Sequence, residues 1–95
     1  MNLVNAVIKN DVEQLTKLLV DGADPNLVED KAKVTLLHYA AQNDSLEVAR
    51  KLVKAGARWD SITEDGYTPL DIARLVNCSR MVEFLSQFEY MSKDR

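Results

Sequence analysis

Apolar residues recur at helical spacing along most of this chain, and polar residues fill the positions between them. Between Leu46 and Ala55, one apolar stripe is set against charged residues on the other faces, which predicts an amphipathic helix. Similar stripes predict helices over 3–9 and 12–20, and another from Ser79 onward. The expected core stripes are Leu46, Ala49, Leu52 and Val53 in the first of these helices, and Val82, Leu85 and Phe88 in the last. The pattern predicts a chain built of short helices.

The same pattern returns along the chain at an interval of about 33 residues. Thr35 and Thr68 are separated by this interval, whereas Gly22 and Gly56 are separated by one residue more. The other equivalent pairs are Leu37 and Leu70, Ala40 and Ala73, Ala6 and Ala40, and Leu18 and Leu52. The extra residue falls within 29–34, where we expect an enlarged loop tip. Such a period, with two helices in each unit, is typical of a repeat solenoid.

Residues that start and stop helices stand at equivalent places in the units. Thr35 and Thr68 are suited to cap the first helix of a unit, and Pro69 suits its first position. Gly22 and Gly56 are expected to end the second helices. Asn and Asp tolerate the left-handed conformation, so we expect tight turns between the two helices at Asn10, Asp44 and Asn77.

Four segments, 22–26, 35–41, 65–68 and 68–73, closely resemble the ankyrin repeat. The resemblance covers roughly residues 3–87. It departs from the family pattern at Leu36, Asp71 and Lys33, where the family usually has proline, histidine and the tip glycine. It implies an all-α ankyrin-repeat solenoid of paired antiparallel helices joined by β-hairpin-like loops. We expect a single domain over residues 1–95, with units at 2–26, 27–60 and 61–92, of which the first lacks a hairpin.

The composition narrows the class of protein. The net charge of −3 argues against general affinity for nucleic acid, which needs clustered lysine and arginine. No apolar run approaches the roughly 20 residues that cross a bilayer, and residues 1–13 lack the features of a signal peptide. Cys78 is the only cysteine, which favours a reducing compartment. We expect a cytoplasmic protein that binds neither nucleic acid nor membrane, with nuclear and secreted-effector locations left open.

Few residues could support catalysis or bind a metal. The chain has one histidine, His38, and one cysteine, Cys78, and nothing in the sequence places them together as base and nucleophile. Its three glycines lie too far apart for a phosphate-binding loop. We therefore expect no cofactor, no metal and no enzymatic activity. By the resemblance, His38 would bond backbone in the adjoining hairpin, while Asp71 at a helix start is expected to be a cap or dipole partner.

Two further residues have both a structural and a functional interpretation. Trp59 could be a hot spot for binding, but its equivalence to Pro25 favours packing against the stack. Asn26 follows Leu18 by eight residues, a spacing that resembles ankyrin substrates of an asparagine hydroxylase. We favour the simpler interpretation, in which Asn26 bonds the loop backbone.

The resemblance implies that a partner would bind on the concave side, at the hairpin tips and the exposed face of the first helices. The positions assigned to this surface are Val34, Gln42, Asn43, Glu64, Asp65, Tyr67, Leu75 and Val76, with Ile8, Lys9, Lys31 and Ala32 beside them. Tyr67, Leu75 and Val76 are large apolar residues at positions expected to face solvent, which would suggest a contact surface. The alternative is that the segment 88–95 covers Leu75 and Val76. We expect Phe88 and Tyr90, with Met91, to seal the last core, and docking of a partner helix is the alternative.

Two functions are open on this basis. The first is a monomeric protein–protein interaction module that binds a protein of unknown identity through a rigid, preformed surface. An adaptor, an inhibitor and an effector would all fit this description. The second is a regulatory or targeting ankyrin segment of a larger protein whose activity lies outside this chain. An enzyme in its own right is a distant third.

Overall fold

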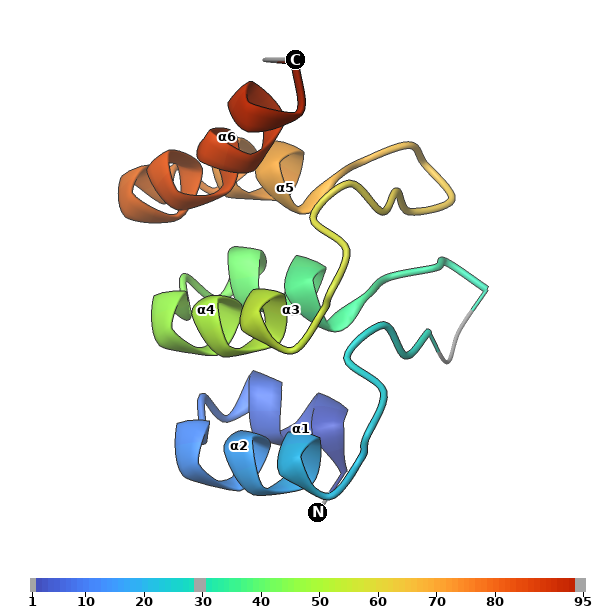
Figure 1. The fold of residues 1–95 in the computed structure, drawn as a ribbon. Helices are drawn as coiled ribbons and strands as arrows, with labels where there is room; N and C mark the ends of the chain where they lie inside the picture. The colour runs from blue at the N-terminus through green and yellow to red at the C-terminus, as the bar shows by residue number, and fades with distance from the viewer. Residues whose placement is uncertain (1, 29–30, 94–95) are drawn as a thin grey trace.

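The computed structural model describes residues 2–28 and 31–93, and its helices form three antiparallel pairs stacked one above another (Figure 1). The pairs are α1 (Leu3–Ile8) with α2 (Val12–Val20), α3 (Leu36–Gln42) with α4 (Leu46–Lys54), and α5 (Pro69–Leu75) with α6 (Ser79–Lys93). The described residues contain no strand, and the loops between pairs project to one side. The all-α solenoid expected from the sequence is confirmed.

Threonine caps begin the first helix of the second and third units. The Thr68 hydroxyl accepts a hydrogen bond from the backbone N–H of Asp71 at 3.1 Å, and the Asp71 carboxylate accepts one from the Thr68 N–H at 3.0 Å. Pro69 occupies the start of this helix, where no intrahelical donor is needed. Thr35 and His38 make the same reciprocal box at α3. The expected caps are therefore present, and Asp71 is a capping residue.

The turn between the two helices of each unit depends on one residue in the left-handed region. Its φ is 56° at Asn10, 53° at Asp44 and 60° at Asn77, as the sequence predicted. The N–H that follows each of these residues reaches back to a fully buried alanine. These bonds are Asp11 N to Ala6 O at 2.8 Å, Ser45 N to Ala40 O at 2.9 Å and Cys78 N to Ala73 O at 3.0 Å. One turn geometry is thus used three times.

Small side chains let the first helices of successive units approach closely. Ala6, Ala40 and Ala73 stand at equivalent positions and are all fully buried. Helix α3 packs on both α1 and α5, and α4 packs on α2. The core therefore continues from one unit to the next, as a repeat stack requires.

The core stripe of the second helices differs in part from the sequence prediction. Val48 and Met81 are equivalent and fully buried, yet the predicted stripes include neither. Several residues that were expected in the core are only half-buried: Leu46, Val53, Val82 and Phe88. The reason is that each second helix is flanked by a first helix and by a neighbouring unit, so two adjacent positions face inward instead of one.

No helix among residues 2–28 and 31–93 combines the length and the apolar character needed to span a bilayer.

Candidate functional site

Two columns of equivalent positions lie at the C-terminal ends of the three first helices, formed by the last residue of each helix and by its C-cap. One column contains Ile8, Gln42 and Leu75, and the other contains Lys9, Asn43 and Val76. All six side chains are exposed, and Leu75 is 67% exposed. The described part of the C-terminal segment therefore does not cover Leu75 or Val76, which was the alternative raised by the sequence.

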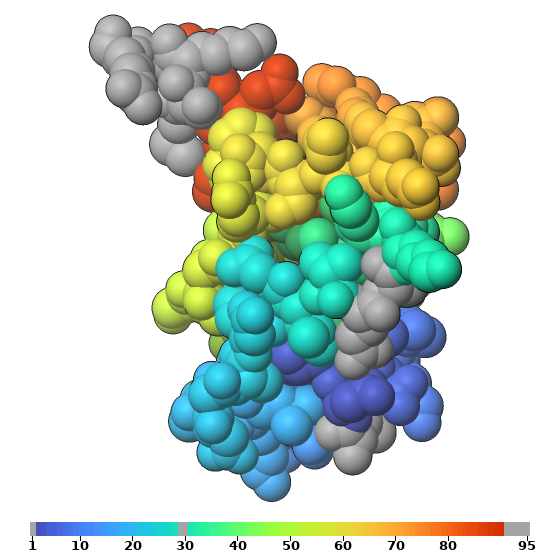
Figure 2. Space-filling view, turned by 90° about the vertical axis from the view of Figure 1, so that its right-hand side faces the viewer, coloured from blue at the N-terminus to red at the C-terminus, as the bar shows by residue number. Residues whose placement is uncertain are grey.

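The hairpin tips lie beside this face and are held by backbone hydrogen bonds. The Thr63 N–H donates to the Tyr67 carbonyl at 2.9 Å, and the Tyr67 N–H donates to the Thr63 hydroxyl at 3.2 Å. The Glu64 N–H donates to the Ala32 carbonyl at 2.7 Å, which joins the tip of the third unit to that of the second. Figure 2 shows these two loops side by side on one face of the molecule. The tips thus form one ordered surface.

Tyr67 and Leu75 are the two predicted binding residues that share a depression. Together with Gly66, Asp71 and Arg74 they line a shallow depression of about 430 Å³. Gln42, Asn43 and Val76 do not line it, although all three are exposed. The other predicted tip residues differ in exposure: Glu64 and Asp65 are exposed, whereas Val34 is half-buried. The predicted surface is thus hollowed at the third unit, where Tyr67 and Leu75 line it beside Asp71 and Arg74.

His38 has a structural position beneath this surface. Its Nδ1 accepts a hydrogen bond from the Thr35 N–H at 3.1 Å and lies 2.7 Å from the Thr35 hydroxyl. Its Nε2 lies 2.7 Å from the Tyr67 carbonyl of the next hairpin. Burial lowers the pKa of His38 below 6.5, opposed by the Tyr67 hydrogen bond and the Asp71 charge. The expected bond to the adjoining hairpin is confirmed, and both ring nitrogens are occupied.

The surroundings of Cys78 do not activate its thiol as a nucleophile. The imidazole of His38 is fully engaged with Thr35 and Tyr67 and offers no free nitrogen as a base. Desolvation raises the pKa of the Cys78 thiol, and the Asp44 carboxylate raises it further. A thiol in this state is protonated at neutral pH and is a weak nucleophile. Within residues 2–28 and 31–93, no three His, Cys, Asp or Glu side chains converge to hold a metal ion.

Asn26 links the loops of the first and second units. Its side-chain amide donates to the Gly56 carbonyl at 3.1 Å, and its side-chain oxygen accepts from the Arg58 N–H at 2.7 Å. The interpretation that Asn26 bonds the loop backbone is therefore confirmed. Trp59 in the same loop is half-buried and packs against the core, as its equivalence to Pro25 indicated.

The C-terminal part of α6 only partly follows its prediction. Phe88 is half-buried and meets the Phe84 ring edge-on, with 5.2 Å between ring centroids. Tyr90 is 74% exposed, so the expectation that it seals the core is wrong. Tyr90 stands five residues after the buried Leu85, so helical geometry turns its side chain away from the inward face. The side chain of Met91 lies outside the described residues.

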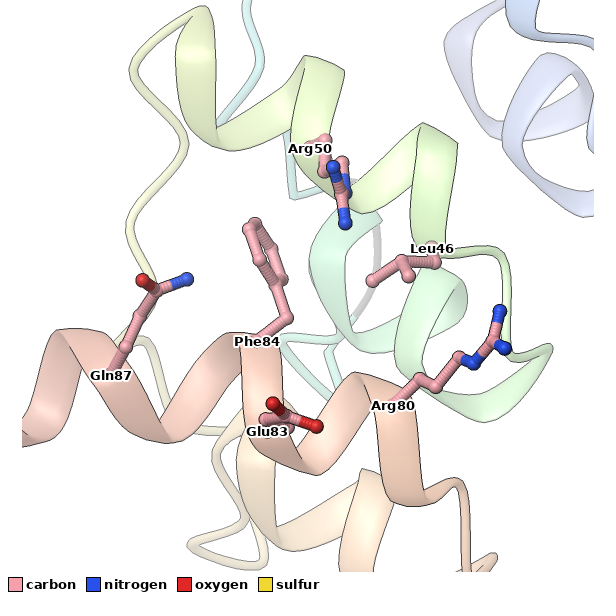
Figure 3. A pocket seen from close by; sticks show the side chains of 6 residues that line it. All are labelled: Leu46, Arg50, Arg80, Glu83, Phe84 and Gln87. Carbon is pink, nitrogen blue, oxygen red and sulfur yellow. The ribbon is translucent and has the colours of Figure 1, made fainter.

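The structure also contains a groove that the sequence did not predict. It lies between α4 and α6, on the second helices, and Figure 3 shows the side chains that line it. They are Leu46, Arg50, Arg80, Glu83, Phe84 and Gln87. The signal that could have indicated it is Phe84, a large apolar residue outside the expected core stripe of the last helix. Its partner Arg50 stands on a different helix, and only the stacking of the units brings the two together.

Comparison with known proteins gives one family and several relatives. The family model for ankyrin repeats, in three copies, matches residues 3–94. The chain is 38% identical over 81 residues to Nuclear factor NF-kappa-B p105 subunit of Mus musculus, covering 84% of this chain and 8% of that protein. It is 39% identical over 83 residues to Potassium channel GORK of Arabidopsis thaliana, and the match covers 87% of this chain and 10% of that protein. For ARF GTPase-activating protein Git of Drosophila melanogaster, the identity is 32% over 90 residues, and the match covers 95% of this chain and 12% of that protein. The chain thus spans only 8–12% of the length of these relatives.

Proposed function

The chain belongs to the ankyrin repeat family, and on that premise we propose that it binds a protein partner through its hairpin tips and its exposed first-helix face. Ankyrin repeats are in general non-catalytic modules of protein–protein interaction. The observation that carries the proposal is the depression at the third unit, which Tyr67 and Leu75 both line. Both side chains are large, apolar and exposed.

The physical case for this surface has two parts. When a partner buries exposed apolar side chains, the free energy of binding becomes more favourable by about 25 cal/mol for each Å² of apolar surface removed from water. The tips around them are already ordered by the Thr63–Tyr67 and Glu64–Ala32 hydrogen bonds, so little conformational entropy is lost on binding. Gln42 and Asn43, at the end of α3, are also exposed and supply polar contacts on the same face. We propose that the module acts as a monomer in the cytoplasm.

Paired substitutions test this surface. We expect Tyr67→Ala and Leu75→Ser each to weaken binding to a captured partner by about tenfold or more, because each removes apolar contact area. Val20→Ser is the matched control, since Val20 is 79% exposed on α2, away from the tips. Affinity is measured by titration calorimetry after the partner has been isolated from the source cell. Unchanged affinity in both Tyr67→Ala and Leu75→Ser would show that the partner binds elsewhere.

A second candidate function is that of a regulatory or targeting segment within a larger protein. The observation in its favour is that the relatives match this chain over 8–12% of their own length. They include a potassium channel and a GTPase-activating protein by name, so similar repeats occur beside very different activities. Reading the open frame around these 95 codons distinguishes the two candidates. A frame that extends well beyond them would favour the segment.

A further inference from the structure

The groove between α4 and α6 is separate from the surface described above. None of its six lining residues belongs to the tips or to the first helices. It is about 490 Å³ in volume and open to solvent, with side chains from both helices directed into it or along its rim (Figure 3). A ligand in this groove would therefore leave the Tyr67 and Leu75 depression free.

The floor of the groove is apolar and held in place. Leu46 and Phe84 are half-buried, and both pack against the core while keeping part of their surface exposed. The Phe84 ring also makes an edge-on contact with Phe88. An apolar side chain of a ligand would find a preformed contact here, with little ordering cost.

Two arginines stand beside this floor, one on each helix. The guanidinium of Arg50 lies 5.8 Å from the centre of the Phe84 ring, a cation–π contact that positions it over the floor. Arg80 lines the groove from α6 and is exposed. In the described part of the chain, no carboxylate oxygen lies within ion-pair distance of either guanidinium. Their hydrogen-bond donors are available to a carboxylate from outside.

The charge around the groove favours an anionic ligand. Helix α4 carries Arg50, Lys51 and Lys54 against the single acid Glu47, although the whole chain has a net charge of −3. Lys51 and Lys54 line the neighbouring hollow between α2 and α4, so the positive charge continues along this side of the stack. The one acidic residue in the groove itself is Glu83. Its carboxylate repels an anionic ligand, so removing this charge should strengthen the binding of such a ligand.

We propose that the α4–α6 groove binds an acidic peptide segment that carries an apolar side chain. The apolar side chain packs on Leu46 and Phe84, and carboxylates of the peptide accept hydrogen bonds from Arg50 and Arg80. A peptide fits better than a nucleic acid, because the floor of Leu46 and Phe84 takes an aliphatic or aromatic side chain. The chain thereby has two binding surfaces, one on the first helices and one on the second.

The probe for the test is a fluorescein-labelled glutamate-rich peptide with a central leucine, titrated with the 95-residue chain by fluorescence anisotropy at low salt. We expect Arg50→Gln and Arg80→Gln each to weaken binding by about five- to tenfold. Glu83→Gln should tighten binding by about two- to threefold, because it removes the opposing charge. Lys17→Gln is the matched control: it removes one positive charge from an exposed position on α2 that does not line the groove, and it should leave affinity unchanged.

Two further probes separate this groove from general charge attraction. The same peptide with serine in place of leucine should bind at least about fivefold more weakly, since it cannot use the Leu46–Phe84 floor. Single-stranded DNA of equal charge should bind more weakly than the leucine peptide. The proposal is overturned if Lys17→Gln weakens binding as much as Arg50→Gln, if Glu83→Gln fails to tighten it, or if the serine peptide or the DNA binds as well as the leucine peptide. Circular dichroism of each variant confirms that the helices are retained.

Discussion

His38 is the residue that joins a helix cap to the next hairpin, and its bonds require the neutral imidazole. The hydrogen on Nε2 is donated to the Tyr67 carbonyl, and Nδ1 accepts from the Thr35 N–H. A second proton would have to sit on Nδ1, and it would remove the hydrogen bond that this nitrogen accepts from the Thr35 N–H. Burial and this arrangement agree with the lowered pKa of His38.

A pH dependence of stability follows from this residue. The pKa of His38 is below 6.5 in the folded chain and near 6.5 in the unfolded chain, so the unfolded chain binds the proton more readily. The contribution of His38 is therefore present above pH 6.5 and is lost as the pH falls from 6.5 toward the lowered pKa. We expect the free energy of unfolding, measured with urea, to decrease over that interval.

His38→Gln provides the control for this prediction. Glutamine does not titrate, so the variant should be less stable at neutral pH but should lack the histidine contribution to the pH dependence. Carboxylates titrate in both proteins, and the difference between the two curves isolates His38. Parallel curves for the wild type and the variant would contradict the assignment.

Lys33 shows the conformational free energy that one residue costs when it departs from the family pattern. It stands one repeat before Gly66 and has φ of 60°, close to the 86° of that glycine. The sequence identified Lys33 as the replacement for a tip glycine, and the backbone adopts the left-handed conformation in spite of its side chain. Such a conformation costs about 1–2 kcal/mol in a residue with a Cβ atom. The hairpin geometry is therefore imposed by the surrounding tip and not by Lys33 itself.

At the scale of the element, α6 is held against the core by buried side chains on one face, such as Met81 and Leu85. Met81 is fully buried, whereas Tyr90 on the same helix is 74% exposed. We expect Met81→Ala to lower the free energy of unfolding by about 2–5 kcal/mol, because it leaves a cavity in the core. Tyr90→Ala should change it by no more than about 0.5 kcal/mol. Urea unfolding of both variants checks the pair, and a loss in Tyr90→Ala as large as that in Met81→Ala would contradict the assigned burial.

The helices illustrate which parts of an element can be predicted. The range 12–20 predicted for the second helix agrees with α2, because Asp11 caps it and Gly22 follows its end within the same stretch of sequence. Met81 was missed because a helical stripe predicts one inward face, whereas the neighbouring unit adds a second direction of burial. Tyr90 is exposed because it stands off the stripe that contains Leu85.

At the scale of the whole molecule, three units share one continuous core, and each is stabilised by its neighbour. We therefore expect the stack to unfold as one cooperative unit. Trp59 lies in the loop between α4 and α5 and packs against the core, so its emission reports on that packing. Its fluorescence and the far-ultraviolet circular dichroism should give the same urea midpoint. A fluorescence transition that precedes the loss of helix would instead indicate that the third unit unfolds separately.

The binding surfaces differ in how far sequence reasoning reached them. The first-helix face was located from equivalent positions, and its residues Leu75 and Val76 are exposed as expected, although their binding role stays a prediction. The α4–α6 groove was not located, because Arg50 and Phe84 stand one repeat apart on different helices. Their contact exists only once one unit has stacked on the next.

The sequence by itself determined the repeat period, the threonine caps, the left-handed turns and hence the ankyrin fold. Each of these depends on residues a few positions apart or on a pattern that returns unit after unit. Only the tertiary structure decided which apolar side chains are covered and which are left at the surface. Leu75 and Met81 are both large and apolar, yet one is 67% exposed and the other fully buried. The difference arises because burial is set by what packs against a helix from outside, and the helix's own residues do not encode that neighbour.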